Sequence, residues 1–164
     1  MLYIKNGRLY TRSFSFELPE EMSIVTDPDG VTPDTLILET VDGKYQIEIG
    51  AWIRDTSPHE QIEHLINYAS YILMSDIFEV TRGEMKGCGA FYRNSSWHDE
   101  YYEERLDFPM NEDGQNALIL GIQHESFSTD EQNNLANFME RPNIKRFLES
   151  IKYEPDECKA VISG

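Results

Sequence analysis

The sequence predicts an α+β fold in which a largely antiparallel sheet lies between helices, an α/β/α arrangement. Strand-like segments separated by turn residues dominate the chain, and this pattern is typical of hairpins rather than of parallel strands joined by helical crossovers. Two segments with one apolar stripe each, residues 57–74 and 144–151, supply a helix for each face of the sheet. We expect one domain, residues 1–153, followed by a loosely ordered tail, residues 154–164.

Four strands are predicted before the first of these helices. Residues 8–18 alternate apolar and polar side chains, which is typical of a half-buried strand, and Pro19 ends it. The other three strands are expected over residues 22–26, 35–41 and 45–53. Asp42 and Gly43 separate the last two, and an Asp-Gly pair between strands predicts a two-residue hairpin turn.

The segment 57–74 has the strongest helical signal in the chain. Ser57 suits the N-cap, Pro58 suits the first helical position, and Glu60 completes a capping box. Apolar residues then recur at spacings of three and four: Ile62, Leu65, Ile66, Ala69, Ile72 and Leu73. We therefore expect one helix that covers a face of the sheet.

Four more strands are predicted after this helix. Residues 78–84 and 88–93 read as a hairpin that turns at residues 85–87, and a polar loop follows over residues 94–99. The pattern of residues 101–108 alternates. Residues 117–122, with the sequence ALILGI, are apolar on both faces, which predicts a central strand covered on both sides.

The C-terminal part is predicted to be helical. Ser128 and Glu131 form a second capping box, and the short helix behind it is expected to bury Leu135, Phe138 and Met139. Pro142 ends that helix. A last amphipathic helix follows, with Ile144, Phe147, Leu148 and Ile151 on its apolar face.

This arrangement resembles the Mog1/PsbP-like (DcrB-like) family of α/β/α sandwiches. The resemblance rests on an aromatic strand that runs into Leu-Pro-Glu, a hairpin with a long middle helix, a glycine-rich strand pair, and an apolar strand with a closing helix: residues 14–20, 35–74, 83–92, 117–122 and 147–153. It implies a non-enzymatic role in binding or assembly, since family members bind a small GTPase or support the oxygen-evolving photosystem. No partner-binding residue carries over to this chain.

The charge of the chain excludes some classes of partner. Its net charge is −16, and such a field repels phosphate backbones and anionic membrane surfaces. We therefore expect no binding to nucleic acid or membrane, and a basic protein as the natural partner. The N-terminal residues show no secretory signal, and no run approaches a membrane span. These features predict a cytoplasmic protein.

The segment 95–113 is the most acidic part of the sequence, and it carries aromatic residues. Two interpretations remain open. The segment is a partner-binding surface in which aromatic side chains supply contact area and carboxylates attract a basic partner, or it is an edge strand whose charged outer face prevents aggregation. The candidate binding residues are Trp97, Asp99, Glu100, Tyr101, Tyr102, Glu103 and Glu104.

A metal site is the alternative function. His98, Glu100 and His124 would be the ligands of a metal-binding protein or a metal-assisted hydrolase. Because neighbouring residues in a strand point to opposite faces, His98 is better explained as an exposed loop histidine. The sequence therefore assigns no metal ligand, and it implies no cofactor.

No catalytic residue is assigned. The sequence lacks the GxSxG, HExxH, P-loop and dinucleotide-binding motifs. Cys88 lies between two glycines in a strand-like run, and we expect it to be a buried thiol rather than a nucleophile. Cys88 and Cys158 are the only cysteines, and a disulfide between them remains open. The function that the sequence favours is a non-catalytic module that binds or assembles with another protein.

Overall fold

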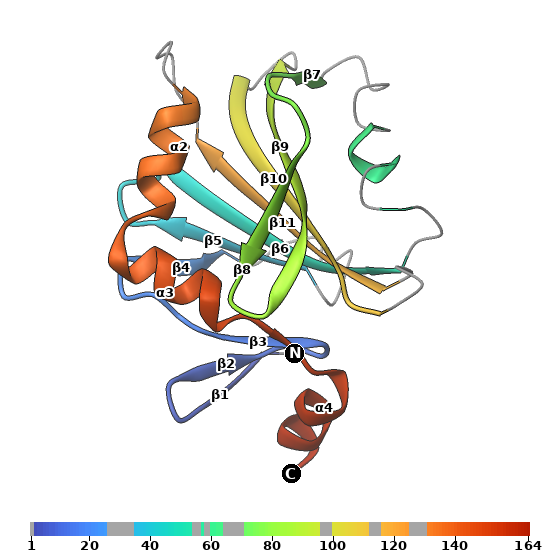
Figure 1. Cartoon of the computed structure of the whole chain (residues 1–164). Coiled ribbons are helices and arrows are strands. Elements are labelled where there is room, and N and C mark those ends of the chain that lie inside the picture. Colours follow the sequence, from blue (N-terminus) through green and yellow to red (C-terminus); the bar gives the residue numbers. More distant parts are fainter. Residues whose placement is uncertain are drawn as a thin grey trace.

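A computed structural model describes residues 2–25, 35–53, 57, 60–63, 71–95, 100–111, 116–124 and 131–164. Its strands form two sheets (Figure 1), and every strand pair in the described residues is antiparallel. The smaller sheet has the order β1-β2-β3-β12. Its strands are β1 (Tyr3–Lys5), β2 (Arg8–Tyr10), β3 (Phe14–Glu17) and β12 (Lys152–Tyr153).

The larger sheet has the order β4-β5-β6-β11-β10-β9-β7, and β8 pairs with β9 as well. Its strands are β4 (Met22–Val25), β5 (Thr35–Thr40), β6 (Tyr45–Ile53), β7 (Tyr71–Leu73), β8 (Phe78–Arg82), β9 (Met85–Ser95), β10 (Glu100–Pro109) and β11 (Asn116–His124). The strand β11 lies between β6 and β10, and it is buried on both faces over most of its length. The prediction of a central strand over residues 117–122 is therefore confirmed.

The helices do not enclose the sheet, so the predicted α/β/α fold class is wrong. The protein is mostly antiparallel sheet, in two sheets with a few short helices. The helices α2 (Glu131–Met139) and α3 (Pro142–Ser150) lie on one face of the larger sheet, and α4 (Pro155–Ser163) packs beside β2 and β3 (Figure 1). Within the described residues, no helix has the length and apolar character needed to cross a membrane.

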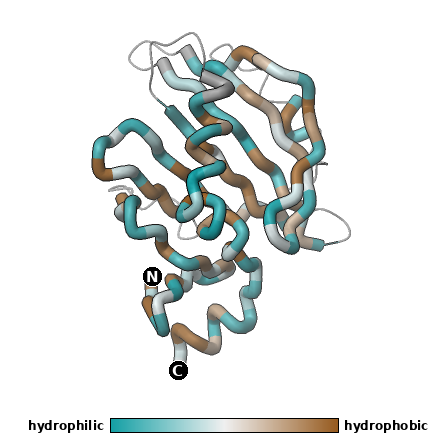
Figure 2. The backbone as a smooth tube through the Cα atoms, turned by 60° about the vertical axis from the view of Figure 1, so that its left-hand side comes forward, coloured by the Kyte–Doolittle hydropathy of each residue, from teal (hydrophilic) through white to brown (hydrophobic). Residues whose placement is uncertain are grey.

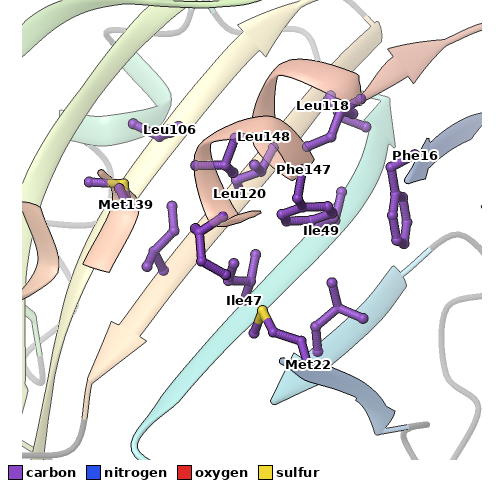
Figure 3. Packing of buried hydrophobic residues seen from close by; sticks show 14 of the residues in the cluster. Phe16, Met22, Ile47, Ile49, Leu106, Leu118, Leu120, Met139, Phe147 and Leu148 are labelled. Carbon is purple, nitrogen blue, oxygen red and sulfur yellow. The ribbon is translucent and has the colours of Figure 1, made fainter. Parts of the chain in front are cut away.

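The main core lies between the larger sheet and α2 and α3. Hydrophobic and hydrophilic residues alternate along the strands (Figure 2), and this alternation turns one set of side chains toward the helices. Phe147 and Leu148 of α3 lie over strands that carry Ile49 and Leu118 (Figure 3). The predicted inward residues of the C-terminal helices are all buried, which confirms them: Leu135, Phe138, Met139, Ile144, Phe147, Leu148 and Ile151.

The predicted helix over residues 57–74 begins as expected but does not reach Met74. Backbone N–H groups confirm the capping box: Glu60 donates to Ser57 Oγ over 3.2 Å, and Ser57 donates to Glu60 Oε2 over 3.3 Å. Residues 60–63 are helical, whereas Tyr71–Leu73 form β7 on the edge of β9. The apolar residues at the end of this segment fit the period of a helix and that of a strand. Pairing with β9 makes Tyr71–Leu73 a strand. Pro58, Leu65, Ile66 and Ala69 lie outside the described residues.

The N-terminal strand over residues 8–18 is in fact two strands. A turn separates β2 from β3, and Thr11 fixes it, because Thr11 Oγ1 donates to the Phe14 carbonyl and accepts from the Phe14 N–H. The strands predicted over residues 22–26, 35–41 and 45–53 are confirmed as β4, β5 and β6. Four residues link β5 to β6, so the turn at Asp42-Gly43 is longer than the two residues predicted.

The hairpin of β8 and β9 turns at Gly83-Glu84 and not at residues 85–87. Gly83 has φ +59°, a conformation that favours glycine, and Arg82 pairs with Met85 across the turn. Gly87 lies inside β9, where a side chain would collide with the backbone carbonyl of Asp107. Gly87 therefore allows β9 and β10 to lie close together, and it is not part of the turn.

The segment after Tyr153, predicted to be a loosely ordered tail, forms the helix α4. Pro155 suits its first turn. Cys158 of this helix is buried, and Cys88 is buried beside Ala90 and Tyr92 in β9. Neither cysteine forms a disulfide in the structure.

Candidate functional site

The two faces of the larger sheet differ in character. The face opposite α2 and α3 is called the outer face here, and it carries the side chains that alternate with the core residues of β6, β11 and β10. Polar and charged side chains lie on this face where the three strands adjoin: Glu48, Gln123, Glu103 and Arg105. Ile62, from the short helical segment, covers another part of the outer face above Ala90 and Tyr92.

A pocket of about 250 Å³ opens on the outer face. It lies over β6, β11 and β10, and one residue of the short helical segment, Gln61, closes one side. Its lining consists of Glu48, Gly50, Trp52, Ile53, Gln61, Glu103, Arg105, Ile119 and Gly121. The pocket therefore combines an aromatic ring and aliphatic groups with two carboxylates and one guanidinium group.

An ion pair forms one wall of the pocket. Arg105 Nε donates to Glu103 Oε2 over 3.0 Å, and Gln123 Nε2 donates to Glu103 Oε1 over 2.8 Å. The Glu103 side chain is 1% exposed and that of Arg105 is 21% exposed. Burial alone would lower the pKa of Arg105, but the attraction and hydrogen bond of Glu103 outweigh it, so the pKa is raised. Arg105 is a fixed cation beside a fixed carboxylate.

Two glycines make room for the side chains of the pocket. A Cβ atom at Gly121 would lie 2.5 Å from Glu103 Oε1, and one at Gly50 would lie 2.5 Å from Trp52 Nε1. The Glu103 carboxylate and the Trp52 indole therefore each lie directly over a glycine of the sheet. No larger residue at either position leaves these two groups where they are.

Polar groups of three strands meet on the outer face beside Arg105. Asn94 Nδ2 donates to the Tyr101 hydroxyl over 2.6 Å, and the hydroxyl groups of Tyr101 and Tyr71 are 3.4 Å apart. Burial, and then the hydrogen bond with Tyr71, raise the pKa of Tyr101. The guanidinium carbon of Arg105 lies 5.9 Å from the centre of the Tyr71 ring. The Tyr71 ring is therefore a second neighbour of the Arg105 guanidinium group, besides the Glu103 carboxylate.

The predicted binding residues do not share one surface. Glu103 points to the outer face, whereas Tyr102 packs against the main core from the other face, and Glu104 is buried there too. Tyr101 is half-buried in the hydrogen-bonded group described above. The side chain of Glu100 and the residues Trp97 and Asp99 lie outside the described part of the structure. The edge-strand interpretation is wrong, because β10 lies between β9 and β11.

Glu104 is an unusual buried carboxylate. It is 2% exposed, and its Oε2 atom has no hydrogen-bond partner among the described residues. Burial raises the pKa of Glu104 to about 7, and the positive charge of Arg82 opposes this rise only in part. Glu104 faces the core side of the sheet, away from the pocket on the outer face.

Of the three predicted metal ligands, only His124 has a side chain that the structure describes. His124 is 8% exposed, and its ring stacks on that of Tyr45 with the centroids 4.4 Å apart. His98 and the side chain of Glu100 are outside the described residues. Among the residues that the structure does describe, no group of three or more His, Cys, Asp or Glu side chains is placed to hold a metal ion.

Sequence reasoning missed Glu48, Trp52 and Arg105 as members of a site. In the strand predicted over residues 45–53, the sequence assigns no site residue. The alternate positions of the same strand carry Glu48 and Trp52, so the pattern that identified the core also marked the opposite face. The pairing of β6 with β11 and of β11 with β10 brings these residues to Arg105, and no local pattern shows this pairing.

Comparisons with known proteins support the fold and nothing finer. No family model and no curated protein matches the chain. A structure from Bacteroides thetaiotaomicron matches 95% of the chain with a TM-score of 0.54 and 11% identity, and the chain spans about half (49%) of that protein. LpqN of Mycobacterium tuberculosis, involved in cell envelope biogenesis, matches 87% of the chain and 83% of its own length, with a TM-score of 0.50 and 12% identity.

The two similar structures bear on the expected membership of the Mog1/PsbP-like family. The chain has a fold similar to these two solved structures, so the expectation that it shares a known fold is confirmed at that level. The assignment to the Mog1/PsbP-like family is not supported by them. At such low identity, the similarity gives no information about partner or substrate.

Proposed function

We propose that this chain is a non-catalytic binding module for another protein, and that the outer face of the larger sheet around the pocket is its contact surface. The partner presents a basic surface. The observation that carries the proposal is the pocket itself, in which Trp52 lies beside two carboxylates on a sheet face that α2 and α3 do not cover.

Exposure and charge both favour this face. Trp52 is 44% exposed and Ile53 is 85% exposed, and aromatic side chains at the centre of an interface carry much of the binding energy. Among the described lining residues, Glu48 and Glu103 outnumber Arg105, and the whole chain has a net charge of −16. A basic partner would be attracted from a distance and oriented toward this surface.

Site-specific crosslinking tests the proposal. A photoreactive amino acid at Ile53 stands at the pocket. One at Val41, which is 90% exposed in the turn between β5 and β6, is the matched control. We expect a discrete protein adduct from position 53 only, which disappears when Glu48→Gln is added or when the salt concentration is raised. Equal adducts from both positions, or none from position 53, would contradict the proposal.

The cytoplasm is the compartment that we propose for this function. Fractionation of cells that express the full natural protein tests it. Recovery in the soluble cytoplasmic fraction is the expected result, and recovery in the membrane or envelope fraction would overturn it.

A further inference from the structure

We propose that the pocket on the outer face binds a single arginine side chain of the partner, stacked on Trp52 and paired with Glu48. This inference rests on the proposed function, and it names the chemical group that the pocket recognises. It is carried by the position of the indole ring, by the charge of the lining and by the size of the pocket.

The indole ring of Trp52 forms a platform. Its Nε1 and Cδ1 atoms would lie 2.5 and 3.3 Å from a Cβ atom at Gly50, so the ring lies back along β6 over that glycine. Glu48 lies beyond Gly50 on the same face of β6, on the side away from Trp52. Since Trp52 remains 44% exposed, part of its ring is open to a ligand. Tryptophan is the best aromatic partner for a cation, and arginine is the more frequent cation in such contacts.

The charge of the lining selects a cation over an anion. Among the lining residues that the structure describes, Glu48 and Glu103 carry two negative charges and Arg105 carries one positive charge, so these described residues sum to −1. The Nε–H group of Arg105 is committed to Glu103 Oε2. A carboxylate or phosphate ligand would approach against both carboxylates and against the net charge of the chain. A guanidinium group would be attracted by both.

The size of the pocket favours one side chain. Its volume is about 250 Å³, below the roughly 300–1,000 Å³ typical of pockets that enclose a small molecule. Arginine fits better than lysine on chemical grounds. Its planar guanidinium group stacks on an aromatic ring and still presents N–H groups at its edge to a carboxylate, whereas lysine provides a compact, strongly hydrated point charge.

Titration with a defined probe tests the inference. The probe is N-acetyl-arginine methylamide, and the neutral control is the citrulline compound, which has nearly the same shape. The readout is the NMR signal of the Trp52 indole N–H. We expect saturable shifts with a dissociation constant on the order of 10 mM for the arginine probe. We also expect at least about three-fold weaker binding for the lysine compound and no saturation with citrulline.

Variants locate the site. Glu48→Gln should weaken binding of the arginine probe by about five-fold, the loss expected for one charged contact. Glu39→Gln is the matched control, because Glu39 is a carboxylate of the neighbouring strand β5 that bonds to Gln46 and does not line the pocket. It should change binding by less than about two-fold. Trp52→Leu should weaken binding by at least about three-fold.

Each outcome decides the inference. It is overturned if the arginine probe causes no saturable shift, if citrulline or lysine binds as well as arginine, or if Glu39→Gln weakens binding as much as Glu48→Gln. Crosslinking at position 53 is read separately. An adduct there together with failure of the arginine probe removes the arginine pocket and leaves the proposed function standing. The absence of any adduct from position 53 in the otherwise natural protein removes the function.

Discussion

Replacing Glu104 with glutamine should stabilise the folded protein at pH 8 and have a much smaller effect at pH 5. Glu104 is 2% exposed, and its Oε2 atom lacks a hydrogen-bond partner among the described residues. Burial raises its pKa from the ordinary 4.5 to about 7, with Arg82 opposing the rise. At pH 8 the folded protein therefore holds a poorly compensated buried charge, which the variant lacks.

The magnitude follows from the two pKa values. The folded state binds the proton more tightly than the unfolded state, so the free energy of unfolding falls as the pH rises from 4.5 to about 7. Since one pKa unit corresponds to about 1.4 kcal/mol, the loss is about 3 kcal/mol once the pH exceeds 7. The stability contributed by this group is fully present below pH 4.5. Between pH 5 and pH 8, the Glu104→Gln variant should gain about 2–3 kcal/mol relative to the natural protein.

Urea unfolding of both proteins at pH 5 and pH 8 measures this difference. Glu103→Gln is the matched control, because Glu103 is the adjacent residue and points to the opposite face. Its two oxygens accept from Gln123 and Arg105, so its replacement removes the carboxylate that is hydrogen-bonded to a mostly buried guanidinium group. We expect Glu103→Gln to destabilise the protein by about 2–4 kcal/mol at both pH values.

A Glu104→Gln variant whose free energy of unfolding runs parallel to that of the natural protein from pH 5 to pH 8 would show that Glu104 titrates alike in the folded and unfolded states. Stabilisation by Glu103→Gln would show that the ion pair with Arg105 opposes folding, and would refute the account of that wall of the pocket.

The other predictions concern packing and thiol chemistry. Gly121→Ala should lower the free energy of unfolding by about 1–3 kcal/mol in urea, because the methyl group would displace the Glu103 carboxylate from its two hydrogen bonds. Tyr92→Phe should cost about 1 kcal/mol and speed amide exchange in residues 60–63, since the Tyr92 hydroxyl donates to the Ile62 carbonyl over 3.1 Å. Cys158 is buried with its pKa raised by that burial to about 11, so a disulfide reagent at pH 8 should modify it at least about 100-fold more slowly in the native protein than in urea.

Gly50→Ala is the control for Gly121→Ala. Gly50→Ala would place a methyl group as close to Trp52 Nε1 as Gly121→Ala places one to Glu103 Oε1, but Trp52 is half-exposed and can move. Its cost should stay below about 1 kcal/mol. Equal costs for the two glycines, unchanged exchange in Tyr92→Phe, or rapid native modification of Cys158 would each contradict the packing described.

Local patterns in the sequence identified most strands but not their arrangement. The alternation in residues 45–53 and the two-sided apolar run over residues 117–122 predicted β6 and β11, because strand period and burial are visible in a short window. The break at Thr11 and the strand Tyr71–Leu73 were missed. A side-chain hydrogen bond decides the first, and pairing with a distant strand, β9, decides the second.

The candidate site could be predicted only in part, for the same reason. The acidic segment pointed to β10, which does supply Glu103 and Arg105 to the pocket. Its adjacent residues Glu103 and Glu104 were grouped as one surface, although neighbours in a strand face opposite sides of a sheet. Trp52 and Glu48 join the site through pairing with Ala117 and Gly121, which lie 65 and 73 positions further along the chain. A single sequence does not show such pairing.

The most direct test of the central claim is the affinity of the crosslinked partner, once purified, for the natural protein and for the Trp52→Leu and Glu39→Gln variants. If the pocket on the outer face is the contact site, Trp52→Leu weakens binding by about ten-fold or more, as for an aromatic residue at an interface centre, and Glu39→Gln stays within about two-fold. An affinity that Trp52→Leu leaves unchanged would contradict the account.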